Sequence, residues 1–120
     1  MMAHVTAAAL VSECKTLAHP ASVDSIPTSA GREDHVSMGT WAARKLAIVV
    51  ARLRSVLAIE LLLAAQGIDL RERRTSPALQ RAHEMVRARV AKLDDDRFLH
   101  PDMETAATLV ADLDPAALLG

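Results

Sequence analysis

The sequence predicts an all-α protein, a fragment of a long-helix bundle in which one helix of about 33 residues precedes shorter helices. Residues 33–66 contain no proline and a single glycine, Gly39. The composition is 51% hydrophobic but only 2% aromatic, and alanine is abundant. Alanine-rich helices bury little area each, which favours close packing against further helices. Apolar residues recur in this stretch at the three- and four-residue steps of a helix with one buried face: Leu46, Val49, Val50, Leu53, Val56, Leu57, Leu61 and Ala64.

The first half of the chain should contain a helix, a loop and then the long helix. Residues 1–15 hold neither proline nor glycine and should form the first helix. Residues 16–31 should form an irregular loop, because Pro20, Pro27 and several small polar residues interrupt any helical pattern. The long helix should then cover about residues 33–66, a length of about 50 Å at 1.5 Å per residue.

Local signals mark where the long helix ends and the next helix begins. Gly67 is expected to end the long helix in a left-handed conformation. Ser76 then offers a hydroxyl cap and Pro77 a favourable first helical residue, which together predict a helix over residues 77–92. Its inward-facing residues are predicted to be Leu79, Met85, Val86 and Val90.

The end of the chain should contain one more helix and a short turn. Three adjacent aspartates at 94–96 should break the preceding helix. His100 and Pro101 begin the last helix, whose first turn carries acidic residues that suit the helix dipole. Asp114 and Pro115 begin the final short turn.

Charge and residue types exclude several classes of partner. The net charge is −1, so nothing in the charge favours nucleic acid. The basic cluster of Arg71, Arg73 and Arg74 is interpreted as a solvated turn. No membrane segment is expected, because the most apolar window, residues 46–65, contains three charged side chains. A single cysteine, Cys14, suits a reducing cytoplasm.

No metal site is expected either. The aspartates at 94–96 lack the alternating spacing, the glycine and the distal glutamate of a calcium-binding loop. The histidines are scattered, and none forms the helical pair that zinc sites use. They lie at positions 4, 19, 35, 83 and 100.

Residues 25–40 are the most specific stretch of the chain. They read Ser-Ile-Pro-Thr-Ser-Ala-Gly-Arg-Glu-Asp-His-Val-Ser-Met-Gly-Thr, a string that ordinary helix capping does not require. This run resembles the C-terminal region of the histidine ammonia-lyases, within the aromatic amino acid lyase family. Residues 1–120 are therefore expected to be a partial C-terminal helical region of such a lyase, with no complete independent domain. Further stretches resemble the same region, at residues 5–13, 19–25, 58–62, 66–67 and 75–79.

The resemblance implies an activity and a cofactor. The activity is elimination of ammonia from L-histidine to give urocanate, in histidine catabolism, by a cytoplasmic homotetramer whose long helices bundle together. The cofactor is a methylidene-imidazolone ring that the family forms autocatalytically from Ala-Ser-Gly. This chain has Ser29-Ala30-Gly31 instead, no Ala-Ser-Gly, and no tyrosine to match the one that acts on the substrate in the family. We therefore expect no cofactor-binding residue here and no activity from the chain alone.

Glu33 is the residue predicted to act on the substrate. An acid at a helix start needs no other explanation, because unpaired backbone N–H groups attract carboxylates. By resemblance, however, this glutamate faces the pocket in histidine ammonia-lyases, where phenylalanine and tyrosine lyases carry an amide. A carboxylate can bind an imidazole N–H strongly, and could also assist proton removal beside the ring. Glu33 is thus predicted as catalytic and substrate-binding, and Met1, by resemblance, as a second substrate-binding residue.

The neighbours of Glu33 carry weaker signals. His35 is predicted to be a buried, hydrogen-bonded structural histidine rather than a catalyst. Arg32 stands where the family usually has glutamine, and it would hold Glu33 ionised if the two side chains pair. Cys14 stands where the family usually has asparagine and is not predicted to be a nucleophile.

Two alternative functions stay open. The chain could be a non-catalytic helical module for oligomerisation or interaction, because the apolar face of its long helix needs partners. It could also be a fragment of a phenylalanine or tyrosine ammonia-lyase, or of an aminomutase. In the parent enzyme the substrate would be a small molecule, an amino acid, and the long helices would join copies of the chain.

Overall fold

The computed structural model describes residues 1–71 and 75–119, and within them the chain is helical and has no strand. The predicted all-α fold is confirmed. The α-helices are α1 (Met2–Leu17), α2 (Gly39–Arg71), α3 (Pro77–Arg87), α4 (His100–Asp112) and α5 (Pro115–Leu119). Two short 3₁₀ helices, η1 (Ala21–Val23) and η2 (Ser29–Gly31), lie between α1 and α2.

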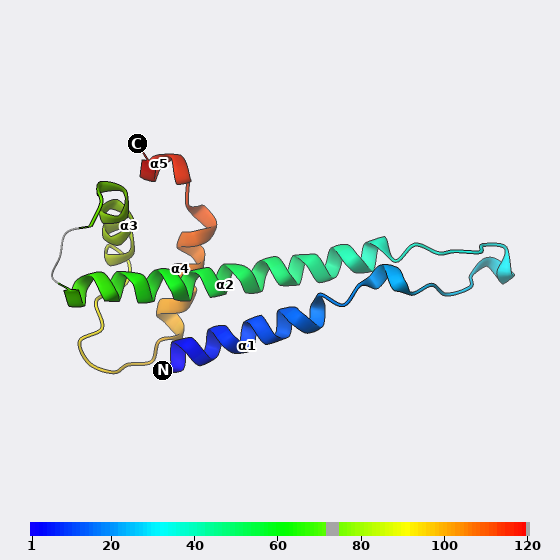
Figure 1. Cartoon of the computed structure of the whole chain (residues 1–120), viewed down its shortest axis with the longest axis horizontal. Helices are drawn as coiled ribbons and strands as arrows, with labels where there is room; N and C mark the ends of the chain where they lie inside the picture. The colour runs from blue at the N-terminus through cyan, green and yellow to red at the C-terminus, as the bar shows by residue number, and fades with distance from the viewer. Residues whose placement is uncertain (72–74, 120) are drawn as a thin grey trace.

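The long helix α2 forms the axis of an elongated molecule, with principal dimensions of 68 × 34 × 19 Å. Helix α1 runs antiparallel beside α2, and α4 crosses it (Figure 1). Residues 18–38, called the arm, join α1 to α2 and project beyond both helices at one end of the molecule (Figure 1). The head lies at the opposite end and consists of residues 58–71 of α2, helices α3 and α4, and residues 88–99 between them.

The buried core lies almost entirely in the head. Val86 and Val90 pack on Ala65 of α2, with Leu61 and Leu62 half-buried against them. Small residues allow the close approach of α2 and α4, because Ala58 and Ala106 are both completely buried. The buried hydrophobic residues of the described chain are Ala3, Ala58, Ile59, Ala65, Val86, Val90, Ala106 and Leu109.

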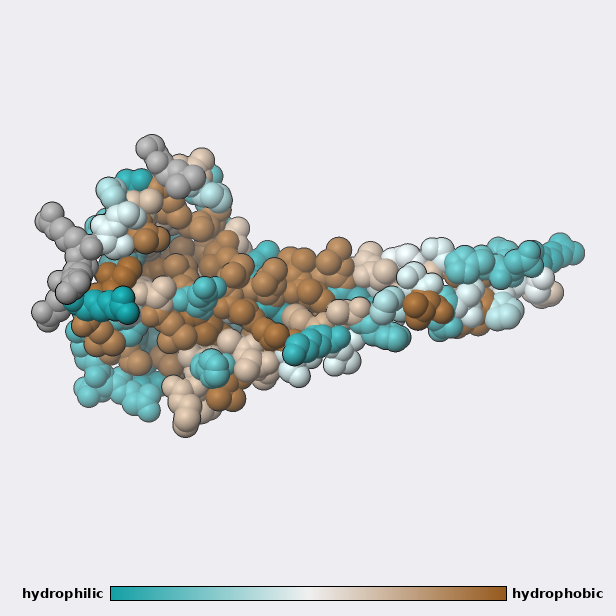
Figure 2. All heavy atoms as spheres, viewed as in Figure 1, coloured by the Kyte–Doolittle hydropathy of each residue, from teal (hydrophilic) through white to brown (hydrophobic). Residues whose placement is uncertain are grey.

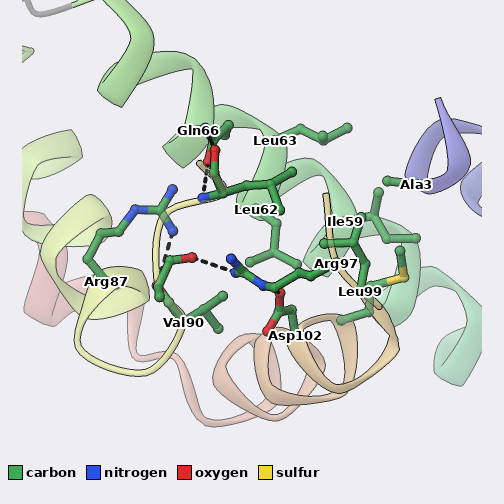
Figure 3. A pocket seen from close by; sticks show the side chains of 13 residues that line it. Ala3, Ile59, Leu62, Leu63, Gln66, Arg87, Val90, Arg97, Leu99 and Asp102 are labelled. Carbon is green, nitrogen blue, oxygen red and sulfur yellow. Dashed lines mark hydrogen bonds and ion pairs between the residues drawn. The ribbon is translucent and has the colours of Figure 1, made fainter. Parts of the chain in front are cut away.

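Polar contacts fasten the segments of the head to one another. The Gln66 side chain donates to the carbonyl of Leu93 at 2.9 Å and accepts from its N–H at 3.0 Å. Arg97 donates to the carbonyl of Ala91 at 2.7 Å and to the Asp102 carboxylate at 3.0 Å (Figure 3). These contacts hold residues 88–99 against α2 and against the first turn of α4.

Asp69 joins α2 to α3 through two partners. His83 Nε2 lies 2.6 Å from Asp69 Oδ1, and Arg87 Nε donates to Oδ2 at 2.8 Å. Burial alone would raise the pKa of Asp69, but hydrogen bonds from Arg87 and His83 outweigh it, so the pKa lies below its ordinary value. The carboxylate is therefore kept ionised between two helices.

The long helix has the predicted length but different bounds. It spans 33 residues, yet it begins at Gly39 rather than at Glu33 and ends at Arg71 rather than at Gln66. The prediction that Gly67 ends the helix is wrong. Gly67 lies inside α2, because Gln66 bonds to Leu93 and Asp69 bonds to Arg87. These contacts hold the last turn in helical form and offset the roughly 1 kcal/mol that a helical glycine costs.

Helix α3 begins as predicted and ends earlier. Its first helical residue is Pro77, and the Ser76 hydroxyl accepts a hydrogen bond from the N–H of Leu79 at 3.4 Å. The helix ends at Arg87, before the predicted end at Lys92. Val86 and Val90 are buried as predicted, but Leu79 and Met85 are exposed. The basic cluster was interpreted as a solvated turn. Arg71 of this cluster ends α2, and Arg73 and Arg74 lie outside the described residues.

The predicted helix at His100 and short turn at Pro115 are confirmed as α4 and α5. No helix in residues 1–71 or 75–119 is both long and apolar enough to cross a membrane.

Candidate functional site

Glu33 lies in the arm and not at a helix start. It follows η2 and is exposed, well before α2 begins at Gly39. Unpaired N–H groups at the start of α2 therefore do not explain this carboxylate, contrary to the sequence-based expectation. The Ser37 hydroxyl accepts from the N–H of Gly39 at 3.2 Å, which helps to set the helix start beyond residue 38.

Two hydroxyl groups organise the loop that carries Glu33. At its base the Ser25 hydroxyl accepts from the N–H of Val36 at 2.9 Å and lies 3.4 Å from the Val36 carbonyl, to which it donates. At its tip the Thr28 hydroxyl donates to Glu33 Oε2 at 3.4 Å. The base contact keeps residues 31–36 out of the helix, which gives the physical reason for the late start of α2.

The turn between Thr28 and Glu33 has an unusual backbone. Ser29, Ala30 and Gly31 all have positive φ, at 53°, 56° and 77°. For residues other than glycine this left-handed conformation costs roughly 1–2 kcal/mol each. The Gly31 N–H donates to the Thr28 carbonyl at 3.0 Å, which closes the turn. The contacts of Ser25 and Thr28 and the left-handed turn were not predicted from the sequence, although small hydroxyl residues such as these are typical of loops with local side-chain bonds.

The arm gives Glu33 no burial. None of residues 18–38 is buried in the single chain. The prediction that His35 is buried is wrong for this chain, because the loop containing it is exposed instead of packed as part of a helix. Across the described residues, no ion pair joins Arg32 to Glu33. Glu33 is therefore an accessible carboxylate that one hydroxyl holds at a single oxygen.

Met1 and Glu33 lie at opposite ends of the folded molecule. Met1 is completely exposed at the start of α1, beside the head, whereas Glu33 is in the distant arm (Figure 1). One copy of the chain does not bring the two predicted substrate-binding residues together.

A small cavity lies in the head and not at Glu33. Its volume is about 60 Å³. It lies between α2, residues 88–99, the start of α4, and Ala3 of α1 (Figure 3). Its polar side chains Gln66, Arg87, Arg97 and Asp102 are already bonded within the chain (Figure 3). This cavity therefore presents an apolar surface and no free reactive group.

Among the residues that the structure describes, no cluster of side chains fits a metal ion. Within residues 1–71 and 75–119, no three histidine, cysteine, aspartate or glutamate side chains converge as metal ligands would. Cys14 is half-buried and forms no disulfide.

Comparison with known proteins links the arm to one family. The sequence profile described as "Aromatic amino acid lyase" matches residues 1–88, which include the arm with Glu33. A histidine ammonia-lyase of Burkholderia multivorans is 59% identical over 112 residues, which make up 93% of this chain and 22% of the relative. The chain thus spans about a fifth of the length of the curated relatives that it matches.

Solved structures agree with the sequence match. Histidine ammonia-lyase from Trypanosoma cruzi superposes with a TM-score of 0.90 at 46% identity, over 98% of this chain and 23% of that one. A tyrosine aminomutase from Streptomyces globisporus gives a TM-score of 0.89 at 35% identity, over 96% of this chain and 22% of that one. The helical arrangement in Figure 1 is therefore the one that these enzymes have in the matching segment.

Proposed function

The chain belongs to the aromatic amino acid lyase family, and we propose that it supplies one segment of a histidine ammonia-lyase. The whole enzyme would eliminate ammonia from L-histidine to give urocanate, as part of histidine catabolism in the cytoplasm. The observation that carries the proposal is the accessible carboxylate of Glu33, which accepts a hydrogen bond from Thr28 within the segment that matches the family.

Glu33 would bind the imidazole ring of the substrate. A carboxylate accepts a hydrogen bond from a ring N–H, and charge-assisted bonds of this kind are stronger than neutral ones. A phenyl ring offers no such donor, so Glu33 favours histidine over phenylalanine. Transfer of a proton from the carbon beside the ring to Glu33 is a second role that the same position would allow.

The family's methylidene-imidazolone does not fit the residues of this chain. The ring is made from Ala-Ser-Gly, and the chain has only Ser29-Ala30-Gly31, with the first two residues in reverse order. Those three residues form the left-handed turn of the arm. The electrophile would have to come from other sequence, and the residues of this chain would contribute substrate binding.

The separation of Met1 and Glu33 has a consequence for assembly. If both residues line one substrate pocket, they belong to different copies of the chain, because a single copy holds them at opposite ends (Figure 1). An exposed apolar stripe supports helix-to-helix association along α2. Its residues follow the four- and three-residue steps of a coiled-coil seam: Leu46, Val50, Leu53 and Leu57. Part of the apolar surface of α2 is visible in Figure 2.

Complementation tests the proposal. This chain would be produced together with the part of the Burkholderia multivorans relative that it does not match, and urocanate formation from L-histidine would be followed by absorbance. The assembled pair should form urocanate, whereas the chain alone should form none. In the pair, Glu33→Gln should lower kcat/KM by about 10- to 100-fold, the cost of one charge-assisted hydrogen bond.

The kinetic pattern separates the two roles of Glu33. A rise in KM with little change in kcat would indicate binding of the ring, whereas a fall in kcat would indicate proton transfer. Glu104→Gln, at an exposed acid of α4 in the head, is the matched control and should leave kinetics unchanged. Full turnover by the Glu33→Gln pair would overturn the proposal.

A non-catalytic helical module is the second candidate, favoured by the same exposed stripe of α2. Measurement of the size of the isolated chain in solution tests this candidate. A helical module should self-associate, and a folded monomer would contradict the module. An aminomutase segment is a third candidate, because the Streptomyces globisporus structure is also similar. Analysis of the products would identify it by a β-amino acid in place of urocanate.

A further inference from the structure

The Glu33 carboxylate has one hydrogen-bond partner among the described residues, the hydroxyl of Thr28. Thr28 Oγ1 donates to Oε2 across the tip of the loop at 3.4 Å. The other carboxylate oxygen, Oε1, accepts no hydrogen bond from residues 1–71 or 75–119. One oxygen is therefore tethered while its neighbour is left available to a ligand.

A turn in the backbone of the arm brings Thr28 close to Glu33. Three consecutive residues in the left-handed region, Ser29 to Gly31, reverse the chain between Thr28 and Glu33. The Ser25 hydroxyl closes the base of the same loop at Val36, so the base and the tip are each closed by a hydroxyl.

We propose that Thr28 is a positioning residue for Glu33, an inference that rests on the function proposed above. The Thr28 hydroxyl restricts rotation of the Glu33 carboxylate and presents Oε1 to the ring N–H of the substrate. An exposed glutamate otherwise samples many rotamers, and binding must then restrict it at a cost in affinity. Fixing the carboxylate beforehand removes part of that cost.

The test is a double-mutant cycle in the complemented enzyme, with L-histidine as substrate. Thr28→Val removes the donor at nearly constant shape and should lower kcat/KM by about 5- to 10-fold, mainly through KM. Thr28→Ser keeps the hydroxyl and should restore kcat/KM to within about 2-fold of the original. In a Glu33→Gln background, Thr28→Val should add less than about 2-fold, because the group that Thr28 positions has already been changed.

Matched controls separate positioning from folding. Thr40→Val changes an exposed threonine just beyond the arm and should leave both kinetic constants unchanged. The positioning role is overturned, while the function stands, if Thr28→Ser behaves like Thr28→Val. The same conclusion follows if Thr28→Val costs as much in the Glu33→Gln background as it does in the original chain. If Glu33→Gln alone leaves turnover intact, the proposed function fails, and the positioning role fails with it.

Discussion

The arm and the head of this molecule are held by different means. In the head, two valines and an alanine form a small core, and Gln66 and Asp69 each bond to a segment distant in the sequence. The arm has no buried residue, and its shape depends on the hydroxyls of Ser25 and Thr28 and on a left-handed turn. The head is therefore stabilised by its own packed core. The arm, which contains the family's most specific sequence, is exposed on the surface of the single chain.

This difference indicates where stability and function reside. Mutations of the shielded polar groups in the head, such as Asp69, should act on the free energy of unfolding, because water does not screen their contacts. Substitutions of the side chains that form exposed contacts in the arm should act on substrate kinetics in the assembled enzyme and change the stability of the chain little, since such contacts contribute little. Three predictions separate the two regions, apart from the kinetic tests already given.

The largest effect is expected from breaking the Asp69 contacts in the head. Asp69→Asn should lower the free energy of unfolding by about 2–3 kcal/mol, because Arg87 and His83 lose a shared ionised partner in a shielded site. The Asp69 side chain is only 13% exposed. Urea unfolding followed by circular dichroism measures the change.

The matched control is an ion pair outside the head. Glu13 and Arg52 join α1 to α2 at 2.7 Å, but their side chains are 43% and 41% exposed. Glu13→Gln should leave the urea midpoint unchanged within error, because water screens such pairs. Equal effects of the two substitutions would show that burial does not distinguish the head from the rest of the chain.

The Asp69 contribution should depend on pH. Hydrogen bonds hold its pKa in the folded chain below the ordinary value of 3.8. At pH values between the folded and the ordinary pKa, the unfolded chain therefore binds more protons than the folded chain does. The stabilisation is thus present above the ordinary pKa of 3.8 and is lost as the pH falls through the lower, folded pKa. The difference in urea midpoint between the original chain and Asp69→Asn should be constant near neutral pH and shrink in acid. A difference that grows in acid would contradict the assigned direction.

The smallest effects should come from two glycines, with opposite signs. Gly67→Ala lies inside α2 with no atom within 4 Å of the added Cβ, and should stabilise the chain by about 0.5–1 kcal/mol. Gly31→Ala meets no steric contact either, but its φ is +77°, so it should destabilise the arm's turn by about 1 kcal/mol.

Thermal unfolding measures the change in stability caused by each of the two glycine substitutions. The Gly67→Ala variant should melt at a higher temperature than the original chain. Stabilisation by both substitutions would mean that the arm does not keep its left-handed turn in solution.

Much of the fold was predictable from local sequence. The absence of proline and the three- and four-residue spacing predict a helix of the length that α2 has. Ser76 and Pro77 predict the start of α3, because capping involves only neighbouring residues. The family match of the run around Glu33 was likewise visible from the residues alone. The exposure of His35 was not predictable, because the expected helix included residues 33–38, which the structure places in the arm.

Short-range patterns alone were enough to specify the helical class, the family and the carboxylate on which the proposed function depends. Long-range contacts set where α2 begins and ends. Ser25 holds Val36 outside the helix, while Leu93, His83 and Arg87 keep its last turn helical beyond Gly67. These contacts join residues 11 to 27 positions apart, and their energy outweighs the local preferences from which helix ends are predicted.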